Sequence, residues 1–252
     1  TSDERLHNRF LIMCGRYALA QGLDVIDAQF GTDSSGVSPM PFNWNIAPTQ
    51  GVFFVKENQD KKKLVSMGTW GLIPSWATDP GFASNTINAR VETIAEKPSF
   101  RSAFRSRRCL IPASGYYEWA TEFGNFKSKQ PFYISNKDET LLPMAGIYEE
   151  WVNPSSGEIV TSSAVITREA KGFIAKIHHR MPIFLPKDDW DSWLDPHSLN
   201  EKEVPEYLNL LAKDDPCKGL RAWPVSTAVN SGRATGEQLA QEIKLSEPET
   251  LF

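Results

Sequence analysis

The sequence predicts an α+β fold: one domain with a curved, barrel-like mixed sheet and a few flanking helices. Most of the chain consists of short segments in which apolar and polar residues alternate, as in strands, and only a few segments have helical spacing. Apolar residues make up 40% of the 252 residues and include eight Trp and fourteen Phe, enough for a sizeable core. We expect one domain over residues 13–232, an N-terminal extension over 1–12 and a C-terminal tail over 233–252.

In the first half of the chain a helix comes first, because apolar residues recur on one face at Leu23, Ile26 and Phe30. A loop rich in Gly, Ser and Pro follows, and then two alternating segments joined by a polar turn, which predict two strands. A segment interrupted by Pro and Gly comes next, of the irregular kind that forms binding surfaces. The loop, the two strands and the irregular segment span 31–42, 51–57, 63–72 and 73–90.

The second half begins with a basic helix over 100–108, for which Ser99 is the expected N-cap. Phe100 and Phe104 would share one face of this helix, and Arg101, Arg105 and Arg108 another. Alternation then predicts five strands, over 109–119, 130–136, 142–151, 161–167 and 219–227. Two short helices are expected between the last two of these strands, over 186–194 and 203–214. The chain turns polar after Asn230, and we expect a mobile tail there.

The composition excludes several classes of protein. The net charge of −4 gives no overall attraction to nucleic acid, so any such binding needs a local basic patch. Three cysteines at no regular spacing argue against a disulfide scaffold and fit the cytoplasm. No apolar run approaches about 18 residues, so no membrane span is expected. No Cys/His pairs have zinc-like spacing, and no metal site is expected.

Cys14 directly follows Met13, and this pair allows two interpretations. If translation starts at Met13 and the Met is removed, Cys14 becomes the N-terminus, and its free amine and its thiol can both add to an aldehyde to form a thiazolidine ring. Otherwise Cys14 is a small buried thiol, a common environment for cysteine. The preceding TSDERLHNRFLI lacks the order of a secretory signal, and we expect it to be a tag or a mis-assigned start that lies outside the fold.

Three other segments contain candidate catalytic residues. In GYYEW, Glu118 is flanked by aromatic residues, and desolvation there would raise the pKa of its carboxyl group toward neutrality; the alternative is a solvent-facing strand residue. In IHHRMP, an extended chain would point His178 and His179 to opposite faces, so that only one of them acts in a site and neither need be functional. In NTINARVET, alternation places Asn88 and Arg90 on one face.

The segment KPSFRSAFRSRRC contains five basic residues and no acid. It is either a solvated helix face or part of a surface for single-stranded nucleic acid, which prefers cations interleaved with aromatic rings. The rings that could take part are Trp70, Trp76, Phe100 and Phe104. We interpret Cys109 and Cys217 as structural.

Six motifs occur in a fixed order along the chain: MCGRY, NIAPTQ, WGLIPSW, INARVET, CLIPASGYYEW and IHHRMP. Together they resemble the SRAP family, the SOS-response-associated peptidases understood as abasic-site processing proteins. The resemblance extends from Met13 to about Val229. It implies a single α+β domain with a β-barrel-like core and a basic groove, which needs no cofactor.

The resemblance also implies a reaction and a set of residues. Single-stranded DNA with an abasic site would be the partner, and Cys14 would form a thiazolidine with the opened sugar aldehyde. Glu118 would manage protons around the amine and the imine, His178 would assist opening of the sugar and the reverse reaction, and Asn88 would position the sugar. The implied DNA contacts, with arginines on phosphates and Trp76 on a displaced base, are Arg16, Arg90, Arg180, Trp76, Thr167 and Asn45.

Two other functions compete with this one: a thiol peptidase that removes its own N-terminal segment through Cys14, Glu118 and His178, and a module that binds single-stranded DNA without covalent chemistry. If the thiol fails to trap the imine, a lyase side reaction is expected. We further expect a cytoplasmic monomer that is associated with the nucleoid after DNA damage. The terminal PETLF resembles short peptides that dock in sliding clamps, and the alternative for it is a disordered tail.

Overall fold

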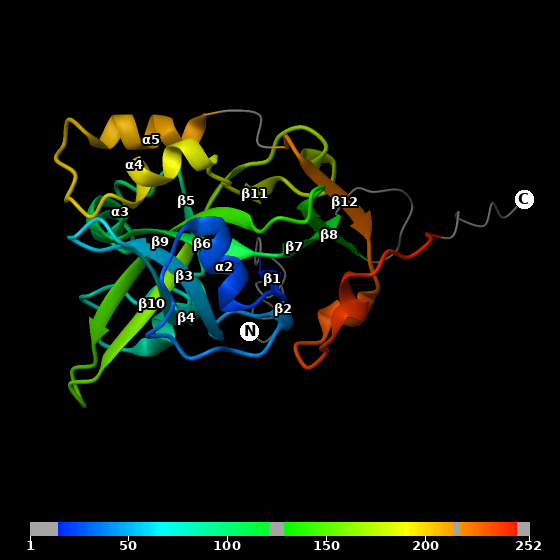
Figure 1. Cartoon of the computed structure of the whole chain (residues 1–252), viewed down its shortest axis with the longest axis horizontal. Helices are drawn as coiled ribbons and strands as arrows, with labels where there is room; N and C mark the ends of the chain where they lie inside the picture. Colours follow the sequence, from blue (N-terminus) through cyan, green and yellow to red (C-terminus); the bar gives the residue numbers. More distant parts are fainter. Residues whose placement is uncertain (1–14, 121–128, 214–216, 246–252) are drawn as a thin grey trace, which may run out of the picture.

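The computed structural model describes residues 15–120, 129–213 and 217–245. Five strands in these ranges close a barrel in the order β4 (Lys63–Trp70), β3 (Gly51–Glu57), β6 (Arg108–Ala113), β9 (Leu142–Val152) and β10 (Ile159–Glu169). The ring closes because β10 pairs with β9 on one side and, in parallel, with β4 on the other (Figure 1). The predicted α+β fold with a barrel-like sheet is therefore confirmed.

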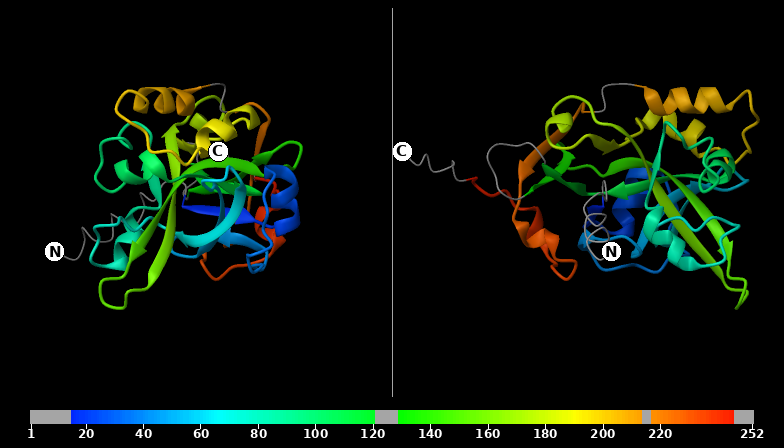
Figure 2. Two further views of the ribbon diagram at one scale, coloured as in Figure 1. Left: turned by 60° about the vertical axis from the view of Figure 1, so that its left-hand side comes forward. Right: turned by 180° about the vertical axis from the view of Figure 1, so that it is seen from behind.

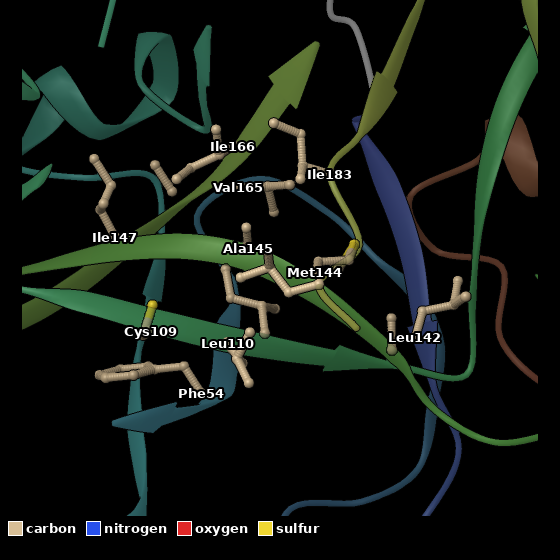
Figure 3. Close-up of a cluster of buried hydrophobic side chains, with 14 of the residues drawn as sticks. Phe54, Cys109, Leu110, Leu142, Met144, Ala145, Ile147, Val165, Ile166 and Ile183 are labelled. Carbon is tan, nitrogen blue, oxygen red and sulfur yellow. The ribbon is translucent and has the colours of Figure 1, made fainter. Parts of the chain in front are cut away.

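Apolar side chains from these strands fill the barrel. All six residues of β6 are buried, as are four consecutive apolar residues of β3. Figure 3 shows side chains from several strands meeting in the interior, among them Phe54, Leu110, Ala145, Ile147 and Val165. Cys109 lies in this core, and burial raises the pKa of its thiol well above the usual value, which fits the structural role predicted for it.

A second, antiparallel sheet has the strand order β12 (Leu220–Pro224), β8 (Gln130–Asn136), β7 (Gly115–Ala120), β1 (Arg16–Leu19) and β2 (Asn43–Ile46). The chain passes directly from the barrel strand β6 into β7 through Ser114. Gly115 opens β7, where a Cβ atom would lie 2.3 Å from Cζ of Tyr133, so only glycine fits. This direct connection brings the second sheet against the barrel.

Two short strands, β5 (Asn88–Arg90) and β11 (Arg180–Pro182), lie on either side of the C-terminal half of β10. Val165 of β10 is paired with Asn88, and Thr167 is paired with both Arg90 and Pro182. The motifs INARVET and IHHRMP are far apart in the sequence, yet both are held against β10, one on each side.

The helices are short and cover the sheets from outside. They are α2 (Leu23–Phe30), α3 (Arg101–Ser106), α4 (Trp190–Leu194) and α5 (Val204–Ala212), with 3₁₀ turns η2 (Pro80–Asn85), η3 (Ile174–Lys176), η4 (Lys187–Asp189), η5 (Thr227–Asn230) and η6 (Glu237–Ala240). In α2, Ile26 and Phe30 are buried, and Gly31 ends the helix at φ 68°, a conformation that glycine adopts readily. Figure 2 shows these helices from two further directions. The segments expected to form α2, α4 and α5 are helical, as predicted.

The basic helix differs from the prediction. It begins after Phe100 with no side-chain cap, so the N-cap role expected for Ser99 is wrong. Phe100 and Phe104 are buried, and Arg108 lies in β6 rather than on the helix. The guanidinium of Arg108 is also buried, and it donates to the backbone carbonyls of Phe104, Arg105, Trp193, Asp195 and His197. Packing of α3 on the barrel therefore removes both rings and Arg108 from the surface.

The segment after Asn230 also differs from the mobile tail that its polar composition predicts. Leu239 is buried, and the indole of Trp223 donates to the carbonyl of Ala240 at 2.8 Å. The backbone nitrogen of Ile243 donates to the carbonyl of Pro224 at 2.9 Å, so the segment packs beside β12 (Figure 1). The expected N-terminal extension and the PETLF motif lie outside the described residues. Among the residues described, no helix has the length and apolar character needed to cross a membrane.

Candidate functional site

Glu118 and His178 form a pair where the two sheets meet. Glu118 comes from β7 and is only 2% exposed, while His178 lies between η3 and β11. Nδ1 of His178 is 3.6 Å from Oε1 of Glu118. This distance is slightly longer than a hydrogen bond, and catalytic contacts often shorten only when substrate binds. The pair is thus suited to exchange a proton in a site largely closed to water.

The beginning of β1 lies beside this pair. Arg16, the first residue of β1, is paired with Tyr117 in antiparallel register, so Gly15 before it lies near Glu118, which follows Tyr117. Cys14 lies outside the described residues. The described chain begins at Gly15, the residue that follows Cys14 in the sequence, and it begins beside Glu118.

The environment of His178 favours the neutral ring. Burial lowers the pKa of His178 below 6.5. A hydrogen bond with the backbone of Arg180 opposes this shift, and the nearby charges of His179, Lys129 and Arg180 add to it. The backbone nitrogen of Arg180 donates to Nδ1 at 3.2 Å, a contact that fixes the orientation of the ring. Neutral imidazole can accept a proton, so this side chain is available as a base near neutral pH.

The two histidines of IHHRMP lie close together, and the prediction that they point to opposite faces is wrong. Their ring centroids are 4.4 Å apart. The prediction assumed an extended chain, but His178 follows the 3₁₀ turn η3, and the strand β11 begins only at Arg180. The turn, rather than strand alternation, sets the direction of His178.

We predict that His178 titrates below pH 6.5, its ordinary value. Since folding disfavours the protonated ring, this group's contribution to the free energy of unfolding is fully present above pH 6.5 and is lost as the pH falls through the lowered pKa. An NMR titration of the histidine ring, assigned with His178→Asn, measures the midpoint directly. A midpoint at or above 6.5 would contradict the buried environment described above.

Asn88 and Arg90 lie on β5, on either side of the fully buried Ala89. Arg90 is exposed and Asn88 partly so, which agrees with the prediction that they share one face. Their strand is paired with the part of β10 that also pairs with β11. Asn88 and Arg90 are therefore held on the side of β10 opposite to the strand that follows His178.

Arg180 and Thr167 are largely buried, in contrast to the direct DNA contacts expected for them. The terminal nitrogens of Arg180 donate to the two carboxylate oxygens of Glu92 at 2.6 and 2.9 Å, and one of them also donates to the carbonyl of Thr167 at 2.9 Å. The side chain of Arg180 is 9% exposed, and that of Glu92 is 47% exposed. A phosphate could therefore reach this guanidinium only by displacing Glu92. Because Thr167 is fully buried, it can support the site only through Arg180.

Asn45 is also buried and cannot contact DNA directly, which corrects the contact expected for it. Its side-chain oxygen accepts from Arg16 at 3.3 Å, and its nitrogen donates to the carbonyls of Ser231 and Ala234 at 2.9 and 3.0 Å. Asn45 thus joins Arg16 to the segment after Asn230. Sequence reasoning missed this segment because its contacts run through backbone carbonyls, which leave no pattern in the sequence.

Among the aromatic residues proposed for nucleic acid, Trp76 is the accessible one. It is 54% exposed, its indole nitrogen donates to the carbonyl of Pro98, and its ring packs edge-on against Phe82. Trp70, by contrast, is buried and donates to the carbonyl of Ile87, so the stacking expected of it, Phe100 and Phe104 is not available. Within the ranges that the structure describes, no group of three or more His, Cys, Asp or Glu is arranged to hold a metal ion.

Residues 13–232 match the family model described as SOS response associated peptidase (SRAP). The chain is 34% identical over 233 residues to the abasic site processing protein YoqW of Bacillus subtilis, covering 91% of this chain and 99% of that protein. It is 32% identical over 216 residues to abasic site processing protein HMCES of Xenopus tropicalis, covering 77% of this chain and 62% of that protein.

A crystal structure of a protein from Bacteroides thetaiotaomicron has the same fold, with a TM-score of 0.76 and 27% identity. The match covers 92% of this chain and 100% of the Bacteroides protein. The fold, the order of the motifs and the match over residues 13–232 agree, and this chain is a member of the SRAP family.

Proposed function

We propose that this protein processes abasic sites in single-stranded DNA by covalent capture of the opened sugar at Cys14. The observation that carries the proposal is the buried Glu118–His178 pair, 3.6 Å apart, beside the chain position that follows Cys14. Relatives that share about a third of the sequence are named abasic site processing proteins, which supports the same class of substrate. The exposed Trp76, and Arg90 on β5, supply a ring and a cation, as single-stranded DNA requires.

The proposed chemistry takes place at the aldehyde carbon of the ring-opened sugar. The amine of Cys14 attacks this carbon to give a carbinolamine, which loses one water to form an imine. The sulfur then adds to the same carbon, and the thiol proton passes to the nitrogen, closing a thiazolidine with no net oxidation or reduction. Glu118 transfers protons at the amine and the carbinolamine oxygen, and His178 takes the hydroxyl proton when the sugar opens.

Two other features follow from this chemistry. The amine must be free, because an acylated nitrogen cannot form an imine, so the reactive form of the protein begins at Cys14. Where the sulfur does not add, the imine permits β-elimination of the DNA strand, which is a lyase side reaction. We assign Asn88 to positioning of the sugar, and Arg16 and Arg90 to phosphates.

A denaturing gel tests the proposal. Protein that begins at Cys14 is incubated with single-stranded DNA in which one uracil has been removed enzymatically. We expect a heat-stable shifted band with the mass of protein plus DNA minus one water, and no such band with Cys14→Ala or with a chain that keeps residues 1–13. Peptide cleavage without a shifted band would favour a thiol peptidase. Salt-sensitive binding without a covalent product would favour a simple binding module.

Arg90→Gln is expected to weaken binding of single-stranded DNA and to lower the slope of log affinity against log salt by about 1, because one phosphate contact is removed. Fluorescence anisotropy over a salt series measures this slope. Lys202→Gln, in the loop before α5, removes an exposed cation and serves as the matched control. An unchanged affinity and slope for Arg90→Gln would remove Arg90 from the phosphate contacts.

A further inference from the structure

A pocket lies beside β2, the edge strand of the five-stranded sheet. It has a volume of about 370 Å³, and Met40, Phe42 and Trp44 supply much of its apolar lining. Gln21 and Asn43 are also among its lining residues. Phe42 is 63% exposed, so a large ring is held at the surface rather than in the core. Pockets of this size, apolar with a few polar groups, typically bind one small chemical group.

The segment 231–235 runs between this pocket and Arg16. Asn45 fixes the segment by donating to the carbonyls of Ser231 and Ala234, and the same side chain accepts from Arg16. At Gly232 a Cβ atom would lie 3.7 Å from a terminal nitrogen of Arg16, so Arg16 is close to one end of the segment. Thr235, at the other end, lines the pocket.

Two cations and then two rings therefore lie along one short path. Arg16 is at its start, Arg233 is exposed on the segment itself, and the aromatic pocket of Phe42 and Trp44 is at its end. Single-stranded nucleic acid is bound by this combination, because the cations hold the phosphates while the unpaired bases stack on the rings. Gln21, among the lining residues, has a side-chain amide that can donate and accept hydrogen bonds at the edge of a base.

We infer that the pocket of Phe42 and Trp44 binds an unpaired nucleobase of the same DNA strand, several nucleotides away from the abasic sugar. Arg16 and Arg233 contact the phosphates in between. This inference rests on the proposed function, since it assumes that single-stranded DNA is the ligand. It adds a subsite that fixes the direction in which the strand leaves the reaction centre.

The test measures binding without chemistry, with the full chain. A short single-stranded oligonucleotide contains one tetrahydrofuran residue, an abasic analogue that cannot open to an aldehyde. A second tetrahydrofuran then replaces each flanking nucleotide in turn, and anisotropy gives the affinity of each oligonucleotide. We expect loss of the base at one position to weaken binding about tenfold, the value of one stacked base.

Phe42→Ala should produce a similar loss with the complete strand and no further loss when that one base is missing, because both changes remove the same contact. Ile159→Ala, which truncates a side chain 64% exposed on the β9–β10 hairpin, serves as the control and should bind like the wild type. Losses that add for Phe42→Ala and the missing base, or no position at which the base matters, would overturn the inference. Failure of the covalent reaction with authentic abasic DNA is a separate result that concerns the proposed function alone.

Discussion

Glu118→Gln is expected to slow covalent capture of abasic DNA about 100-fold while DNA affinity stays close to that of the wild type. Glutamine keeps the shape of the side chain and can still form hydrogen bonds, but it cannot take or give a proton. Glu118 is buried in β7, so its substitution by a residue of the same shape should leave phosphate contacts at the surface intact. Single-turnover capture followed on denaturing gels, together with anisotropy on a tetrahydrofuran oligonucleotide, separates the rate from the affinity.

The matched control is Glu158→Gln, which changes an exposed carboxylate next to the start of β10. It should react at the wild-type rate. A Glu118→Gln protein that captures DNA as fast as this control would remove Glu118 from the proton-transfer steps.

Arg108→Met is expected to lower the free energy of unfolding by about 3 kcal/mol and the melting temperature by about 10 °C. The guanidinium joins the end of α3 to α4 and the residues after it through bonds to five backbone carbonyls. Methionine fills similar space but donates nothing, so buried carbonyls lose their partners. Thermal unfolding followed by circular dichroism measures the change.

Arg101→Met replaces an exposed arginine on α3 and should melt within about 2 °C of the wild type. Below its melting temperature, the Arg108→Met protein should bind DNA normally, because this guanidinium is buried. Normal stability, or a loss of DNA affinity in the folded protein, would contradict the structural role of Arg108.

Most strands could be predicted from the sequence because alternation is a local property. The segments that became β3, β8 and β12 have clear apolar alternation or runs bounded by polar turns, and the structure places strands there. The order of the six motifs was also sufficient to identify the family. That the barrel closes through a parallel contact between β4 and β10 could not be predicted, because this pairing joins residues more than 90 positions apart, such as Thr69 and Ser162.

The predictions that failed concern the direction and burial of individual side chains. His178 was assigned to an extended segment, but the turn η3 sets its direction toward Glu118. Arg108 has the same sequence signature as an exposed arginine of a basic helix, and only packing against α4 shows that it is buried. Asn45, in the motif NIAPTQ, and Thr167, outside the six motifs, were expected to contact DNA but are buried beneath the surface of the site.

The site depends on the contact between the barrel and the second sheet. Glu118 belongs to the strand that continues directly from the barrel, and His178 precedes a strand attached to β10. Neither sheet alone contains both groups, and β1 begins alongside them. A mutation that separates the sheets should therefore reduce capture even if every site residue is kept.

Cooperation between Glu118 and His178 is measured most directly by a double-mutant cycle on the single-turnover rate of capture, with protein that begins at Cys14. The four proteins are the wild type, Glu118→Gln, His178→Asn and the double variant. If the two groups pass one proton between them, the double variant should be about as slow as the slower single variant. Losses that multiply, or two single variants with the wild-type rate, would show that the pair does not act as a unit in the reaction.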